Sequence, residues 1–182
     1  MTNQKIMRAE NNNYTFLNGY GDTGNTDAKK LIESSSKFIN NTLESKLLSD
    51  NATMPERHHD TDAGYDIYAA ETVILEPQQK ALIATDLAVN IPKGYVGLLT
   101  SRSGVSSKTH LVVETGKIDA GFQGHMKINI KNDEENTGFE CNFIKGTDET
   151  WHRLDEEILS GTYIINKGDR LAQLVIVPIW TP

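Results

Sequence analysis

One short segment of this chain places a carboxylate in a glycine turn, where it could activate water. Residues 116–124 read GKIDAGFQG, and Asp119 stands in the turn between two expected strands. A carboxylate beside an electrophilic phosphorus can orient and deprotonate a water molecule. The backbone N–H and C=O groups of such a turn can also read the edge of a flat base. Asp119 is therefore the candidate catalytic residue; the plain alternative is an ordinary aspartate in a turn.

Two further segments offer neutral or cationic donors of the kind that bind phosphate oxygens. Residues 101–104 read SRSG, in which Arg102 has a planar five-donor fork, Ser103 a hydroxyl, and Gly104 room for close backbone approach. Gln173 begins the last strongly apolar run and carries a neutral amide donor. The plain readings are a common loop and an outward-facing polar strand residue, so neither segment decides the function alone.

The histidines show no metal-site spacing, and we interpret all five as solvated or structural. They are His58, His59, His110, His125 and His152.

Short strands must position these residues. From residue 42 the chain alternates strand-length apolar runs with Gly, Pro or Ser, which indicates an all-β sandwich or barrel. The segment from His125 to Lys131 alternates apolar and polar side chains, the period of a half-buried strand. The other expected strands are residues 81–92, 94–101, 111–114 and 174–179.

Two regions differ from this strand-rich part in composition and in the pattern of their apolar residues. Residues 1–41 are rich in Asn and Gly, with a short helix expected after Asp27, and we interpret them as an N-terminal appendage to a domain at 42–182. Residues 132–161 interrupt the strands. There Trp151, Leu154 and Ile158 fall on one helical stripe and Gly161 suits a helix C-cap, so we expect an inserted subdomain with a helix.

Composition excludes several classes of function. The chain has 182 residues and a net charge of −7, which argues against a broad surface for duplex nucleic acid. Its single cysteine, Cys141, suits a reducing cytoplasm, and no apolar run approaches the ~20 residues of a membrane span. The N-terminus lacks the apolar stretch of a signal peptide. We therefore expect a cytoplasmic protein without a membrane partner.

Together with residues 63–70 (AGYDIYAA) and 167–174 (KGDRLAQL), these segments resemble the first four motifs of the trimeric dUTP diphosphatase (dUTPase) family. The resemblance covers roughly residues 42–182, and the insertion is similar to one in dUTPases of staphylococcal phages. It implies a distorted jelly-roll β-barrel and a homotrimer with sites between subunits. It also implies hydrolysis of dUTP to dUMP and pyrophosphate with Mg²⁺, in the host cytoplasm if the chain is phage-encoded.

The resemblance also implies individual roles. Asp119 becomes the general base and contacts the deoxyribose 3′-hydroxyl, and Phe122 becomes a ring beneath the sugar that excludes a 2′-hydroxyl. Asp66 lies near Mg²⁺ and acts through metal-bound water. The remaining expected substrate contacts are Arg102, Ser103, Gly104, Gly116, Lys117, Ile118, Lys127 and Gln173.

Three departures from the family pattern accompany the match. Phe122 stands where Tyr is more frequent, and Ser101 where Pro is usual. The fifth motif, a glycine-rich arm with Arg and Phe, is not found before Pro182, so we expect nucleotide binding with slow turnover. Two alternatives remain open at this point. One is a weakened dUTPase-like regulator that binds nucleotide and a repressor protein; the other is a dCTP deaminase.

Overall fold

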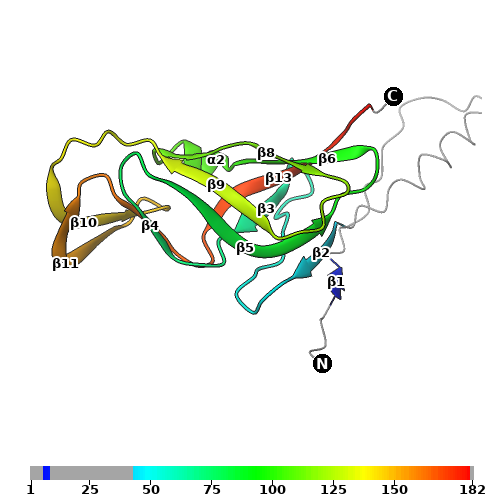
Figure 1. The fold of residues 1–182 in the computed structure, drawn as a ribbon, viewed down its shortest axis with the longest axis horizontal. Coiled ribbons are helices and arrows are strands. Elements are labelled where there is room, and N and C mark those ends of the chain that lie inside the picture. Colours follow the sequence, from blue (N-terminus) through cyan, green and yellow to red (C-terminus); the bar gives the residue numbers. More distant parts are fainter. Residues whose placement is uncertain (1–5, 9–42, 181–182) are drawn as a thin grey trace, which may run out of the picture.

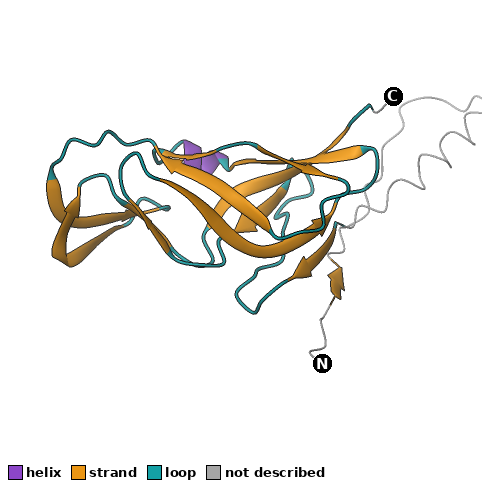
Figure 2. Ribbon diagram, in the orientation of Figure 1, coloured by secondary structure: helices purple, strands orange, loops and turns teal. Residues whose placement is uncertain are grey.

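The structure, a computed structural model, describes residues 6–8 and 43–180, and strands dominate them (Figures 1 and 2). The expected all-β class is confirmed. The strands pair into three sheets and not into one closed hydrogen-bonded barrel. The one helix in the described part of the chain is α2 (Ser103–Ser106). No helix there is long and apolar enough to cross a membrane.

The first sheet has five strands in the order β1-β2-β5-β9-β7. They are β1 (Ile6–Arg8), β2 (Glu44–Leu47), β5 (Lys80–Asn90), β9 (Met126–Asn132) and β7 (Leu111–Val113). The second sheet, β11-β10-β12-β4, consists of β11 (Trp151–Leu159), β10 (Glu140–Gly146), β12 (Tyr163–Ile165) and β4 (Val73–Leu75). The third, β3-β13-β6-β8, consists of β3 (Tyr65–Tyr68), β13 (Arg170–Pro178), β6 (Tyr95–Ser101) and β8 (Gly116–Asp119).

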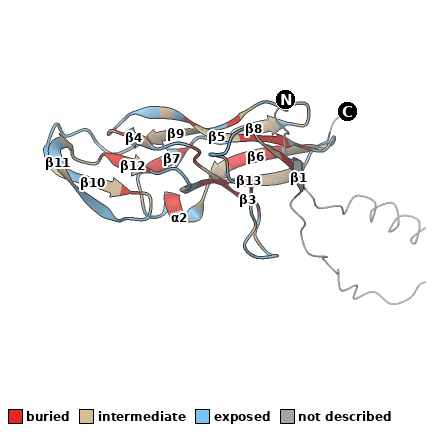
Figure 3. Ribbon diagram, turned by 90° about the horizontal axis from the view of Figure 1, so that it is seen from below, coloured by how far each residue is buried: buried red, intermediate tan, exposed pale blue. Residues whose placement is uncertain are grey.

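All three sheets contribute to the core, the second through Leu75, Tyr163 and Ile165, and the buried parts of the strands are visible in Figure 3. Strand β9 follows the predicted alternation: Met126, Ile128 and Ile130 are buried. The intervening side chains are more exposed, because successive residues of a strand point to opposite faces. The apolar run that begins at Leu174 lies on β13, which is flanked by β3 and β6.

The predicted helix in the insertion is wrong. Residues 151–159 form β11, which pairs antiparallel with β10 as an outlying hairpin (Figure 1). Three apolar residues at helical spacing gave the helical pattern, but most of β11 is exposed, so no helical stripe is buried. Gly161 does have a positive φ of 87°, as a C-cap glycine would. It follows a strand, however, and ends a turn closed by the Thr162 N–H to Leu159 C=O hydrogen bond.

The predicted appendage at 1–41 and its helix lie outside the described residues, apart from β1. Strand β1 pairs antiparallel with β2, so that Ile6 lies opposite Lys46, and it extends the edge of the first sheet.

Candidate active site

The first and fourth motifs lie side by side because a glycine lets their strands approach. A Cβ atom on Gly64 would stand 2.5 Å from the Leu174 carbonyl oxygen and 2.8 Å from Cγ of Gln173, so no larger residue fits there. Two residues later in the motif, Asp66 on β3 lies opposite Gln173 on β13. On the other side Gln173 lies opposite Thr100 at the end of β6. Asp66, Gln173 and Thr100 thus form a row across β3, β13 and β6, here called the Gln173 row. It places the aspartate of the first motif beside the amide of the fourth.

Asp66 is almost completely buried and forms ion pairs with two arginines. Nε of Arg102 donates to Oδ1 of Asp66 at 2.7 Å, and Nη1 of Arg170 lies 3.4 Å from Oδ2. Nη1 of Arg170 is also 2.9 Å from Nε2 of His58. A buried carboxylate is tolerated when such donors satisfy it. The arginine of the second motif is thereby held in place from the first motif.

Beside these ion pairs lies a cavity of about 440 Å³, here called the basic pocket. Its lining includes Tyr68, Arg102, Gly104, Lys108, Asp169 and Arg170. Burial, aided by the negative charges of Glu56 and Asp66, raises the pKa of the Tyr68 hydroxyl, which is a hydrogen-bond donor at neutral pH. Three cationic side chains and a hydroxyl donor can bind an anionic ligand, although the lining also includes the carboxylates of Asp148 and Asp169.

The second motif enters the basic pocket on α2. Arg102 is the N-cap residue, with extended φ and ψ, and Ser103 is the exposed first residue of the helix. The first N–H groups of any helix have no acceptor within the helix. Gly104 leaves room above this turn, since the nearest atom to an added Cβ would be Nη1 of Arg102 at 3.9 Å. Arg102 and Gly104 of this motif line the basic pocket, whereas Ser103 and the motif 4 amide of Gln173 are not among its lining residues.

The third motif lies on β8, at the edge of the third sheet. Lys117 and Asp119 are exposed, whereas Ile118 packs against the core. The Asp119 carbonyl accepts the Phe122 N–H at 2.9 Å, which closes the turn after the strand. The Phe122 ring is 42% exposed, so it is available to a ligand. The strands that flank this segment, β7 and β9, pair antiparallel, but the expected turn between them is wrong for residues 116–119, which form a strand paired with β6.

One chain does not bring all the predicted site residues together. Asp119 lies opposite Val96 on β6, four residues from Thr100, which is opposite Gln173. At ~3.3 Å per residue, Asp119 is displaced from the Gln173 row by about 13 Å along the strands. Lys127 lies opposite Ala84 in the first sheet and also stands apart from this row.

Sequence reasoning missed two residues of this region, Arg170 and His58. Arg170 belongs to the quoted fourth motif, and its polar position just before an apolar strand was a usable signal. No sequence pattern linked His58 to Asp66, because their Nε2 to Oδ2 approach of 3.4 Å depends on the loop fold. The sequence prediction that the five histidines are structural or solvated did not include a contact of His58 with Asp66.

The described residues limit how a metal ion could be held. Among them, no three His, Cys, Asp or Glu side chains cluster as metal ligands. Asp66 supplies one buried carboxylate whose oxygens already accept from arginines. Mg²⁺ commonly keeps several waters and binds substrate phosphates. Phosphates and water would therefore supply most of the shell of a Mg²⁺ ion bound here.

Comparison with known proteins identifies the family. The sequence model of the dUTPase family matches residues 50–140. The deoxyuridine 5′-triphosphate nucleotidohydrolase of Mycobacterium marinum is 36% identical over 140 residues, which cover 76% of this chain and 75% of that protein. The Mycobacterium tuberculosis enzyme of the same name is 34% identical over the same share of each chain. This chain belongs to the dUTPase family.

Solved structures agree at higher identity. The dUTPase of Staphylococcus bacteriophage 80alpha is 64% identical, with a TM-score of 0.75, over 78% of this chain and 93% of that one. The dUTPase of Staphylococcus aureus phage phi11, whose structure visualises a species-specific insert, gives the same values. A variant of the phi11 enzyme coordinates a structural Mg(II) ion. The jelly-roll-like dUTPase fold is thereby confirmed. As replacements for dUTP hydrolysis, a catalytically weakened regulator and a dCTP deaminase gain no support from these matches.

Proposed function

We propose that this chain hydrolyses dUTP to dUMP and pyrophosphate at sites assembled between the subunits of a homotrimer. The observation that carries the proposal is that, within one chain, the third motif lies apart from the other three. Residues of motifs one, two and four line the basic pocket, whereas Asp119 stands about 13 Å along the strands from the row that contains Gln173. A symmetric assembly can bring the Asp119 turn of one copy to the basic pocket of another.

In this mechanism Asp119 accepts a proton from a water molecule. The water oxygen forms a bond to the α-phosphorus while the bond from that phosphorus to the pyrophosphate oxygen breaks. Asp119 suits this role because its carboxylate is exposed and forms no ion pair with any residue in the described part of the chain. The carboxylate is thus free to accept the proton.

The other residues bind and orient the nucleotide. Ser103, Gly104 and Gln173 donate hydrogen bonds to the phosphates. Arg102 keeps its ion pair with Asp66. Phe122 lies against the sugar. Gly116, Lys117 and Ile118 place the turn that reads the base, and Lys127 contributes positive charge. Mg²⁺, when bound, neutralises charge that develops on the phosphates; Asp66 would contact it through water.

Product analysis tests the proposal. Purified full-length chain is incubated with dUTP, UTP or dCTP in Mg²⁺, and pyrophosphate and ammonia are measured. We expect pyrophosphate from dUTP and much less from UTP. Ammonia release from dCTP, or tight dUTP binding without either product, would contradict the proposal.

We further propose that the insertion, residues 132–161, binds a repressor protein. Its hairpin lies at the opposite end of the molecule from β1 and β2 (Figure 1) and exposes the side chains of Phe139, Phe143 and Trp151. Exposed aromatic groups are typical of protein interfaces. The phage 80alpha dUTPases that this chain resembles control transfer of virulence genes by a G protein-like mechanism. The cytoplasmic location and the boundaries of the N-terminal appendage remain predictions.

Calorimetric titration of a repressor from a mobile genetic island tests this contact. We expect Phe143→Ala with Trp151→Ala to weaken binding at least tenfold while pyrophosphate release from dUTP is retained. Unchanged repressor binding by the double variant would show that the insertion does not contact the repressor through these aromatic side chains.

A further inference from the structure

Strand β5 contains a bulge beside the end of the segment that carries Asp119 and Phe122. Its register against β9 shifts between Ala84 and Leu87, and Leu87 lies opposite Met126, the first residue of β9. Inside the bulge Asp86 has a φ of 49°. Few non-glycine residues adopt this left-handed conformation, although aspartate does so more readily than most. Surrounding contacts must therefore hold the bulge in place.

Two hydrogen bonds tie the bulge to the beginning of β9. The Asp86 N–H donates to Nε2 of His125 at 2.9 Å, and Oγ1 of Thr85 donates to the Met126 carbonyl at 2.5 Å. Nε2 of His125 also lies 3.3 Å from Oδ1 of Asp86, so the ring contacts both the backbone and the side chain of that residue. Thr85 is buried, and the Asp86 carbonyl accepts the Leu48 N–H at 2.8 Å. The bulge thus fixes His125 and Met126 and is itself anchored beside β2.

The backbone held by these bonds supports the Phe122 ring. A Cβ atom on Gly124 would lie 3.0 Å from Cζ and 3.1 Å from Cε2 of Phe122, so the ring lies directly over this glycine. Gly124 immediately precedes His125. The other end of the turn is held by the Phe122 N–H to Asp119 carbonyl bond. The position of the ring therefore depends on where the bulge holds the chain after it.

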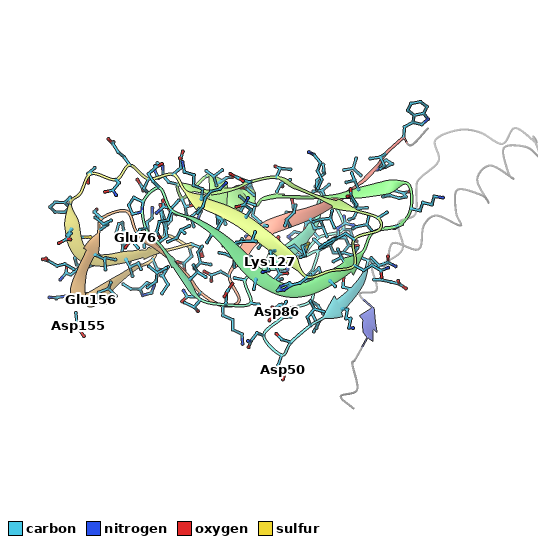
Figure 4. The ribbon with its side chains drawn as sticks, in the orientation of Figure 1. Asp50, Glu76, Asp86, Lys127, Asp155 and Glu156 are labelled. Atoms are coloured by element: carbon cyan, nitrogen blue, oxygen red, sulfur yellow. The ribbon has the colours of Figure 1, made fainter. Side chains whose placement is uncertain are left out.

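We propose that Thr85 and His125 are positioning residues for the Phe122 ring and thereby determine discrimination between deoxyribose and ribose. The inference rests on the proposed function, in which this ring lies beneath the sugar. The Phe122 ring can exclude a 2′-hydroxyl only while it stays close to the sugar. Displacements of about 1 Å are enough to change rates substantially. Thr85 and His125 act through Gly124 and the ring. Figure 4 shows Asp86 on β5, with Lys127 on the adjacent strand β9.

Three variants test the proposal through the ratio of kcat/KM for dUTP to that for UTP. His125→Phe keeps a ring but removes the acceptor, and Thr85→Val keeps the shape but removes the hydroxyl. Each should lower the ratio about tenfold, the scale of one net hydrogen bond. His125→Gln offers an amide oxygen as acceptor in place of Nε2 and should keep the ratio within about twofold of the parent. A ratio unchanged in both His125→Phe and Thr85→Val would overturn the proposal.

Thr162→Val is the matched control for lost stability. Thr162 is also buried, and its Oγ1 donates to a backbone carbonyl, that of Leu159, at 2.6 Å. It should lower Tm about as much as Thr85→Val and leave the dUTP to UTP ratio unchanged. A ratio that falls equally in Thr162→Val would mean that discrimination follows stability and not the position of the ring.

Amide hydrogen exchange measures how firmly the bulge holds residues 122–124 and requires no enzymatic turnover. In nucleotide-free protein the amides of residues 122–124 should exchange about tenfold faster in His125→Phe and Thr85→Val, but not in Thr162→Val. If the parent releases no pyrophosphate from dUTP, the proposed function fails while exchange still decides the positioning role. Unchanged exchange at these amides would overturn that role whatever the activity.

Discussion

At the scale of single residues, the exposed carboxylate of Asp119 makes the sharpest prediction. Asp119→Asn keeps the shape and the Phe122 to Asp119 backbone bond but removes the proton acceptor. We expect dUTP binding within a few-fold of the parent and turnover lower by about 10²–10⁴, the contribution of a positioned base. Calorimetric binding and steady-state pyrophosphate release measure the two effects.

A second exposed aspartate serves as the control for that substitution. Asp155 lies on β11, at the far end of the insertion hairpin (Figure 4). Asp155→Asn makes the same chemical change and should leave turnover unchanged. If Asp119→Asn hydrolyses dUTP at the parent rate, another group is the base.

Phe122 makes a separate prediction about the sugar. Phe122→Ala should raise UTP turnover relative to dUTP, because it removes a half-exposed ring from the turn that follows Asp119. The ratio of kcat/KM for the two nucleotides measures this. Phe139, an exposed aromatic on the insertion, is the control, and Phe139→Ala should not change the ratio. An unchanged ratio in Phe122→Ala, with the fold intact, would assign the ring to packing alone.

At the scale of elements, one buried amide joins the end of β9 to β4 and to the turn that contains Gly161. Nδ2 of Asn132 donates to the carbonyls of Leu75 at 3.0 Å and Gly161 at 2.8 Å, and Asn132 is completely buried. Asn132→Ala leaves both carbonyls without this donor. We expect the free energy of unfolding to fall by about 2–3 kcal/mol. Urea denaturation at fixed protein concentration measures the change.

The same strand offers a matched comparison. Asn129 also lies on β9, but its Nδ2 bonds the exposed carboxylate of Glu114 at 2.6 Å. Asn129→Ala should change the free energy of unfolding by no more than about 0.5 kcal/mol, as is usual at a surface. Equal losses in the two variants would show that Asn132 has no special role in joining the sheets.

At the scale of the whole molecule, the separation of Asp119 from Gln173 predicts complementation between subunits. Gln173→Ala should lower turnover about 10²-fold by removing one phosphate donor. If the two residues act from different copies, refolding this variant with Asp119→Asn at equal amounts should restore about a quarter of the sites in randomly mixed trimers. Pyrophosphate release from the refolded mixture checks this. Activity no higher than the mean of the two variants would place both residues of a site on one subunit.

Local patterns in the sequence were enough for the all-β class and for the strands that carry the motifs. The alternation around Ile128 and Ile130 correctly predicted β9, because a strand with one buried face imposes its period of two on neighbouring residues. The close approach of Gly64 to Gln173 is consistent with the motif-based placement of these residues near one another. The chemical role predicted for Asp119 also came from the sequence, and it awaits the test above.

Only the tertiary structure decided the features that depend on partners distant in the chain. Residues 151–159 became a strand because β10 pairs with them, although three apolar side chains fitted a helical spacing. The contact of Asp66 with Arg170 and the bulge at Asp86 arise from the registers of β13 on β3 and of β5 on β9. Register and pairing are set by the packing of whole sheets, which short-range periodicity does not record. The sequence thus determined which residues could do the chemistry, and the fold decided which of them meet within one chain.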